Sequence, residues 1–300
     1  MNVRLLLWVC AGFILGGCVP GLLRSDAELA QAIAEPARLQ LRLRAATPFV
    51  LTTRERFDRP GEDLNVYLEG DGFAWASRTE PSRDPTPDNP LALALAARDP
   101  AANVVWIARP CQYTPRQDNP ACRDFYWTVG RLAPEVLRAV DAAVTEAKLA
   151  AGAKRINLVG YSGGGGLALL IAAGRSDVAS IRTVAGNLHH QAFTSHHGVS
   201  PMSASLDPAD VAPRLRAVAQ WHFVGGEDKV VPAGIARAYL AAAGPTLCAR
   251  LRVLPGLKHQ DGWVERWPEL LRESAVNVDT RNVDKRNADV SPCAQATPLR

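Results

Sequence analysis

The chain has 300 residues, of which 47% are hydrophobic and 21% are charged. This composition is typical of a globular protein and excludes a disordered chain, a collagen-like repeat and a bundle of membrane spans. The formal net charge is only +4, and the lysines and arginines are scattered along the chain, so neither feature indicates nucleic-acid binding.

The first residues have the pattern of an export signal. Arg4 is the one charged residue at positions 1–17, and an uninterrupted apolar run follows it at positions 5–15. This run is too short for a membrane span, which needs about 20 residues. A charged start followed by a short apolar run instead predicts a cleaved signal peptide at 1–17.

The motif Leu-Gly-Gly-Cys at positions 15–18 resembles the lipobox of bacterial lipoproteins. The resemblance implies cleavage before Cys18, attachment of lipid to that cysteine and, because Val19 follows it, an anchor in the outer membrane that faces the periplasm. The alternative is the leader of a soluble exported protein with a chance cysteine. We expect an anchor segment and entry strands at 18–60.

Four cysteines follow Cys18 in the exported chain: Cys111, Cys122, Cys248 and Cys293. An even number in an oxidising compartment indicates two disulfides, and four cysteines allow three pairings. The shortest loop joins Cys111 to Cys122, which would leave Cys248 to fix the C-terminal segment through Cys293. The alternative is a set of free, buried thiols.

The middle of the chain alternates apolar runs with helical patterns. We expect strands at 64–68, 103–108, 155–160, 181–185, 218–224 and 249–254, and helices at 134–151, 167–173, 233–243 and 263–273. Such alternation predicts an α/β fold, with a mostly parallel sheet covered by helices on both faces. We therefore expect one domain at 61–273 and a polar tail at 274–300.

The motif Gly-Tyr-Ser-Gly-Gly at positions 160–164 carries the strongest chemical signal. It fits G-x-S-x-G between a strand and a helix, a context that exposes Ser162 as a nucleophile and aims the Gly163 N–H at a developing oxyanion. A phosphate loop is the alternative, but the Gly-Lys-Ser/Thr of such loops is absent here. A plain structural turn is the other alternative.

Two later loops supply a carboxylate and an imidazole. Asp228 follows the strand at 218–224, with Glu227 as the neighbouring candidate, and His259 follows the last strand. Alone, the first could be a solvated acidic turn and the second an exposed histidine. In the order Ser162, Asp228 and His259, they can form a nucleophile activated by a base that a carboxylate orients.

With these motifs, residues 60–273 resemble the α/β-hydrolase superfamily, and the chain looks like a lipoprotein-anchored bacterial member. The resemblance implies Ser162 as nucleophile, His259 as base and Asp228 as the orienting acid. The segment Glu-Gly-Asp-Gly at 69–72 stands at the place of the family's His-Gly-x-Gly loop. By that match, the Asp71 N–H would join that of Gly163 in the oxyanion hole, although glutamate replaces histidine here.

Four histidines cluster after the strand at 181–185: His189, His190, His196 and His197. A metal site is one interpretation, but no cysteine or carboxylate completes a convincing ligand spacing. The other interpretation is a short lid insertion at 187–214 over the active site, as the resemblance suggests. Aromatic residues near the strand ends could line an acyl pocket or pack in the core: Phe73, Trp75, Phe125, Tyr126 and Trp127.

These observations predict a serine hydrolase of carboxylic esters, or of thioesters or amides, held in the cell envelope by lipid on Cys18. Its partner would be a small or lipid-like acyl substrate, and no cofactor, metal or nucleic acid is expected. Two alternatives remain. One is a non-catalytic envelope lipoprotein on a hydrolase fold, and the other is an acyltransferase that uses the same acyl-enzyme.

Overall fold

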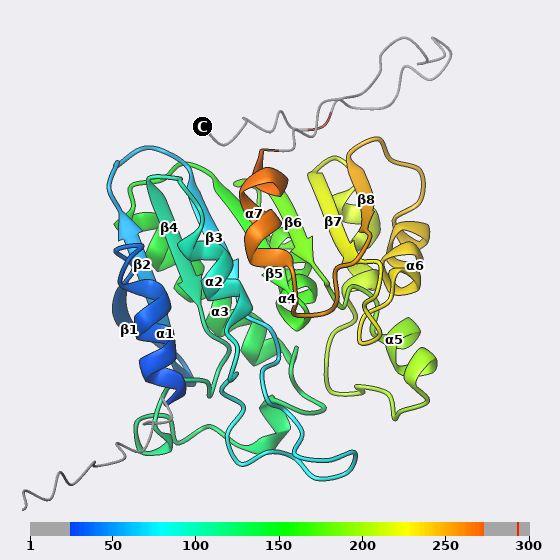
Figure 1. Ribbon diagram of the computed structural model, residues 1–300, viewed down its shortest axis with the longest axis horizontal. Helices are drawn as coiled ribbons and strands as arrows, with labels where there is room; N and C mark the ends of the chain where they lie inside the picture. The colour runs from blue at the N-terminus through cyan, green and yellow to red at the C-terminus, as the bar shows by residue number, and fades with distance from the viewer. Residues whose placement is uncertain (1–24, 273–292, 294–300) are drawn as a thin grey trace, which may run out of the picture.

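In the part of the chain that the structure describes, eight strands form one sheet in the order β1-β2-β4-β3-β5-β6-β7-β8 (Figure 1). The computed structural model describes residues 25–272 and Cys293. The strands are β1 (Gln40–Ala46), β2 (Phe49–Phe57), β3 (Leu64–Leu68), β4 (Asn103–Ile107), β5 (Ile156–Tyr161), β6 (Val178–Val184), β7 (Ala219–Gly225) and β8 (Ala249–Leu254). Strands β3 to β8 are mutually parallel, whereas β2 runs antiparallel to both β1 and β4. The predicted mostly parallel α/β sheet is therefore confirmed.

Helices cover both faces of the sheet. One apolar core contains side chains of α3 (Pro134–Ala150), α4 (Gly163–Ala173) and α6 (Ala233–Ala243). The other contains side chains of α1 (Asp26–Ala34), α2 (Leu91–Ala97) and α7 (Trp263–Leu271), which lie on the viewer's side in Figure 1. Every residue of strands β3 to β7 is buried because both faces are covered, which explains why apolar residues predominate in them.

Helix α4 begins four residues earlier than the sequence predicts. The expected helix spans 167–173, whereas the observed helix begins at Gly163, directly after Ser162. Glycine has a low helix propensity, so four consecutive glycines suggest a loop. All four are nevertheless buried, and close packing against neighbouring backbone keeps them helical.

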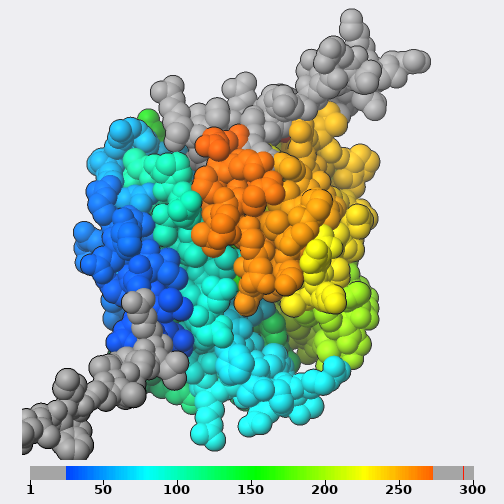
Figure 2. All heavy atoms as spheres, viewed as in Figure 1, coloured from blue at the N-terminus to red at the C-terminus, as the bar shows by residue number. Residues whose placement is uncertain are grey.

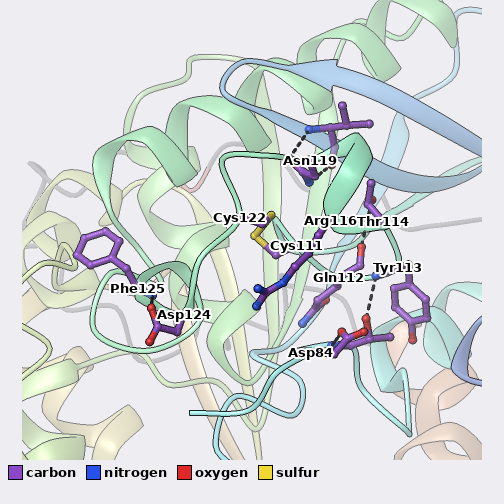
Figure 3. Close-up of a disulfide and its surroundings, with 12 residues drawn as sticks. Asp84, Cys111, Gln112, Tyr113, Thr114, Arg116, Asn119, Cys122, Asp124 and Phe125 are labelled. Atoms are coloured by element: carbon purple, nitrogen blue, oxygen red, sulfur yellow. Dashed lines mark hydrogen bonds between the residues drawn. A yellow bond between two sulfur atoms is a disulfide. The ribbon is translucent and has the colours of Figure 1, made fainter.

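The cysteines form the disulfides Cys111–Cys122 and Cys248–Cys293, so one of the three possible pairings is present. The first bridge lies in the loop after β4, and Figure 3 shows Gln112 and Asn119 beside it. The Asn119 side chain accepts from the Val50 amide and donates to the Val50 carbonyl, which fastens this loop to β2. Apart from Cys293, the expected tail at 274–300 lies outside the described residues, as do Cys18 and the expected signal peptide.

Because β3 to β8 run parallel, the loops after β3, β5, β7 and β8 meet at one edge of the sheet, the lower edge in Figure 1. Helix α5 (His190–His197) follows β6 and lies at the same edge. Ligands of open α/β sheets bind at this carboxyl edge. Within the part of the chain that the structure describes, no helix is both long and apolar enough to span a bilayer.

Candidate active site

Ser162 lies at the turn between β5 and α4, with a φ of 50° and a ψ of −119°. A non-glycine residue at such a φ is strained and persists only where its surroundings hold it. Here the Ser162 amide donates to the Val184 carbonyl, and the Ser162 carbonyl accepts from the Asn187 amide, both at 3.0 Å. The turn thus holds Ser162 at the carboxyl end of β5.

Two glycines of the motif let the helix begin this close to the sheet. A Cβ atom at Gly160 would lie 2.2 Å from the carbonyl oxygen of Gly164, and one at Gly164 would lie 2.3 Å from that of Leu68. Both distances are well below van der Waals contact, so only glycine fits at either position. The end of β3, and the loop that follows it, are thereby placed beside Ser162.

A continuous chain of hydrogen bonds joins Ser162, His259 and Asp228. The Nε2 atom of His259 lies 3.1 Å from the Ser162 Oγ, and its Nδ1 lies 2.9 Å from the Asp228 Oδ2. A carboxylate can only accept, so Nδ1 carries the proton and Nε2 of the neutral ring is free to accept from the hydroxyl. The structure therefore brings together the three residues that the sequence places far apart.

Asp228 is held rigidly for its contact with the imidazole. Its side chain is fully buried, and its Oδ1 accepts from the amides of Val230 and Val231, each at 2.8 Å. The neighbouring candidate, Glu227, is exposed instead. The Trp263 Nε1 donates to the backbone carbonyl of His259 at 3.2 Å. Neighbouring amides thus hold the Asp228 carboxylate, and the Trp263 indole holds the backbone of His259.

The loop at residues 69–72, here named the EGDG loop, is anchored by its glutamate. The Glu69 carboxylate is buried and accepts from the Gly70 amide and the Trp106 Nε1, both at 2.9 Å, and from two amides at the start of α2. Burial raises the pKa of Glu69, although these donors oppose that shift. The glutamate at the first position of the EGDG loop thus ties the loop to β4 and α2.

The Asp71 side chain is clamped between two arginines. Its Oδ2 lies 2.7 Å from the Arg131 Nη1, and its Oδ1 lies 3.0 Å from the Arg109 Nη1. Burial alone would raise the pKa of Asp71, but the charges of Arg131 and Arg109 hold it below its usual value. A Cβ atom at Gly163 would lie 2.0 Å from the Asp71 Oδ1, so the clamped carboxylate touches the start of α4.

The backbone amides of Asp71 and Gly163 therefore lie on adjoining segments beside Ser162. Among the described residues, neither amide donates a hydrogen bond to another protein group. The disulfide-bonded loop also holds the EGDG loop, because its Gln112 Nε2 donates to the Gly70 carbonyl at 3.1 Å. Two amide donors are thus available beside the Ser162 hydroxyl.

A pocket of about 420 Å³ opens above these groups. Ser162, His259 and the EGDG loop line it together with Phe73 and Trp75. The predicted lid segment at 187–214 contributes Asn187 and Phe193 to the lining. The other candidate aromatic residues pack in the core instead: Phe125, Tyr126 and Trp127.

The four clustered histidines do not converge on one point, and only the rings of His196 and His197 pack against each other, with centroids 4.9 Å apart, among the described residues. His189 lies 3.4 Å from Asp207, and the His197 ring bonds the Val230 carbonyl at 2.8 Å, while His196 is exposed. Burial lowers the pKa of His190 to about 4, so its ring is neutral at pH 7. Among the described residues, no group of three or more metal-binding side chains is gathered.

Comparison with known proteins identifies the fold. No family model and no curated protein matches the sequence. Among solved structures, Est1E from Butyrivibrio proteoclasticus matches with a TM-score of 0.54 and 14% identity, over 77% of this chain and 95% of that one. An alpha-beta serine hydrolase homologue from Coxiella burnetii matches with a TM-score of 0.52 and 15% identity, over 77% and 93%. A Pyrococcus furiosus esterase matches with a TM-score of 0.55 and 10% identity, over 79% and 91%. The chain therefore has the α/β-hydrolase fold.

Proposed function

We propose that the protein is a serine hydrolase that cleaves carboxylic esters through an acyl-enzyme formed on Ser162. One observation carries the proposal. The hydrogen-bond chain from the Ser162 hydroxyl through His259 to the buried Asp228, at 3.1 and 2.9 Å, opens into a pocket of about 420 Å³. The fold that the chain shares with the Pyrococcus esterase adds support for this reaction class.

In the first half-reaction, the Ser162 Oγ attacks the acyl carbon while its proton passes to the Nε2 of His259. The buried carboxylate of Asp228 stabilises the resulting imidazolium. His259 then returns the proton to the leaving alcohol as the acyl–oxygen bond breaks. In the second half-reaction, water replaces Ser162 as the nucleophile and attacks the acyl-enzyme. The acid is released, and the free hydroxyl of Ser162 is restored.

The negative charge that develops on the carbonyl oxygen needs donors that are already in place. We assign this role to the backbone amides of Gly163 and Asp71, which have no protein acceptor among the described residues. Preorganised amides of this kind contribute about 3–4 kcal/mol each to transition-state stabilisation in a site shielded from water. The clamp on Asp71 and the anchor at Glu69 fix one of these amides.

The test is labelling with a fluorophosphonate probe, which reacts only with an activated serine. The unaltered protein should label, and so should the control variant Ser77→Ala, which changes an exposed serine. Ser162→Ala should not label, and it should lose turnover of a short-chain nitrophenyl ester. Equal labelling of Ser162→Ala and the unaltered protein would overturn the proposal.

We also propose that the mature chain is held by lipid on Cys18 in the bacterial outer membrane. The support is the lipobox-like motif at 15–18 and the short apolar run before it. Metabolic labelling with an alkyne-tagged fatty acid should mark the unaltered chain and the control Cys10→Ala at the mature mass. Cys18→Ala should take up no label, and label that persists there would refute the anchor.

A further inference from the structure

The pocket above Ser162 has an apolar rim that reaches into solvent. Phe73 is 53% exposed, Trp75 39% and Val230 47%, and all three line the pocket. Together with Phe193 of α5 they are here named the pocket rim. Tryptophan and phenylalanine are favoured where one side of a ring meets an apolar phase and the other meets water.

Trp75 stands apart from the other tryptophans of the described chain. None of these is more than 3% exposed: Trp106, Trp127, Trp221, Trp263 and Trp267. The backbone around Trp75 is nevertheless ordered by pairing with Pro81 and by the Ala76 amide, which donates to the Glu80 carbonyl. An ordered loop therefore presents an aromatic ring to solvent at the entrance of the pocket.

The described chain begins at the same end of the molecule. In Figures 1 and 2, the lower end of α1, in dark blue, lies at the same edge of the molecule as the cyan loop after β3. The charges of Asp84 and Asp88 act with burial to raise the pKa of Asp26, the first residue of α1. Asp88 itself lines the pocket. Ser25, where the described residues begin, therefore lies at the pocket end of the sheet.

The length of the chain between Cys18 and Ser25 limits where a membrane could lie. Ser25 is seven residues after Cys18, and seven extended residues span at most about 25 Å. A lipid on Cys18 would thus keep the bilayer close to the pocket end of the sheet and away from its opposite edge. The rim and the tether constrain the orientation independently and agree.

We propose that the pocket rim docks on the bilayer that holds the lipid anchor, and that the substrate is an amphiphilic ester of a fatty acyl chain drawn from that bilayer. This inference rests on the proposed function for its reaction and on Cys18 for its tether. Phe73 and Trp75 enter the acyl region of the lipid, and the substrate's acyl chain passes between them and Phe193 to reach Ser162.

Fluorescence quenching tests the docking without any need for turnover. The lipidated Ser162→Ala protein is reconstituted into phosphatidylcholine vesicles whose acyl chains carry bromine, which quenches only rings at membrane depth. Emission should fall relative to vesicles without bromine, and the fall should disappear in Ser162→Ala/Trp75→Phe. The matched control Ser162→Ala/Trp127→Phe, which changes a buried ring, should keep it. Quenching that survives Trp75→Phe, or no quenching at all, overturns the docking.

Turnover tests the substrate class. The double variant Phe73→Ser/Trp75→Ser should lose about tenfold more activity on a long-chain ester embedded in vesicles than on a soluble short-chain ester. The control Leu41→Ser/Leu43→Ser removes two exposed side chains of β1, 49% and 58% exposed. It should change the activity on neither ester. Equal losses on both esters would overturn the proposal. Failure of the proposed function is distinct, because the unaltered protein would then cleave neither ester.

Discussion

The turn at Ser162 and the EGDG loop adjoin each other at the site, yet they are built in different ways. The turn is local, since β5, Ser162 and α4 are consecutive, and glycines permit the close approach. The EGDG loop depends on distant groups, because Asp71 is clamped by Arg109 and Arg131, which are 38 and 60 residues away. Short-range geometry holds the proposed nucleophile, and tertiary contacts hold the proposed oxyanion donor.

The largest expected loss of activity comes from a change in the hydrogen-bond chain that ends at Ser162. Asp228→Asn should lower kcat by about 10⁴-fold on a short-chain ester, because an amide can donate to Nδ1 and leave the proton of His259 on Nε2. The fold should be retained, as circular dichroism can verify. The control Glu227→Gln changes the exposed neighbour and should leave kcat within twofold. A loss of similar size in both variants would contradict the role of Asp228.

A smaller loss of activity is expected when the EGDG loop is loosened. Arg131→Met removes the 2.7 Å contact to Asp71 while the contact to Arg109 remains, so the Asp71 amide should be less well held. We expect kcat to fall by about 10- to 100-fold with little change in KM, since an oxyanion donor acts mainly in the transition state. Arg131→Lys, which restores the charge but not the planar fork, should recover part of the loss.

The matched control for that change is Arg138→Met, an exposed position on α3. It should leave both kcat and KM unchanged. If Arg131→Met instead raised KM alone, Arg131 would act on substrate binding, and the clamp would have no positioning role.

The same contrast explains what the sequence could predict. The six parallel strands are predicted from short segments in which apolar residues predominate, and Ser162, Asp228 and His259 are predicted from one motif and the order of two loops. The sequence does not delimit strand β2 because it carries Arg54, Glu55 and Arg56, charges that usually mark a solvent-exposed segment. In the fold Glu55 pairs with Arg44 at 2.7 Å, whereas Arg54 donates to the Gln31 side chain and Arg56 donates to backbone carbonyls.

The supports of the EGDG loop could not be predicted in the same way. Arg109, Gln112 and Arg131 are spaced along the chain without a pattern, and only the folded structure brings them to Gly70 and Asp71. Glu69 could be matched to a family position, but its role depends on Trp106 and the start of α2. Local sequence patterns carry no information on partners that the topology selects.

Removing each disulfide in turn also compares the Ser162 turn with the EGDG loop, and it should change kcat less than the substitutions above. Removal of Cys111–Cys122 should free the loop that carries Gln112 and lower kcat several-fold, whereas removal of Cys248–Cys293 should leave kcat unchanged. Both should lower the free energy of unfolding, by about 3 and about 4 kcal/mol for separations of 11 and 45 residues. Paired Cys→Ser variants, assayed for turnover and for denaturant unfolding, supply both measurements. Equal kcat in the two variants would contradict the prediction that the Cys111–Cys122 bridge supports the EGDG loop.

The smallest effect is one of stability and concerns a histidine within the sheet. His222 of β7 is fully buried, and burial lowers the pKa of its ring to about 3. Below the ordinary pKa of about 6.5, the unfolded chain therefore takes up a proton that the folded chain does not, so stability falls as pH falls and levels off near pH 3. Between pH 7 and pH 5, this one group should remove about 2 kcal/mol from the free energy of unfolding.

His222→Gln should remove that dependence, so denaturant unfolding at pH 7 and pH 5 should differ by about 2 kcal/mol less in the variant. The control His196→Gln changes an exposed imidazole of α5 and should leave the pH dependence as it was. His190, beside the EGDG loop, has a pKa of about 4 for the same reason of burial. His190→Gln should therefore act in the same direction. If neither variant flattened the dependence, burial would not keep these rings neutral, and acid sensitivity would have to come from carboxylates such as Asp71.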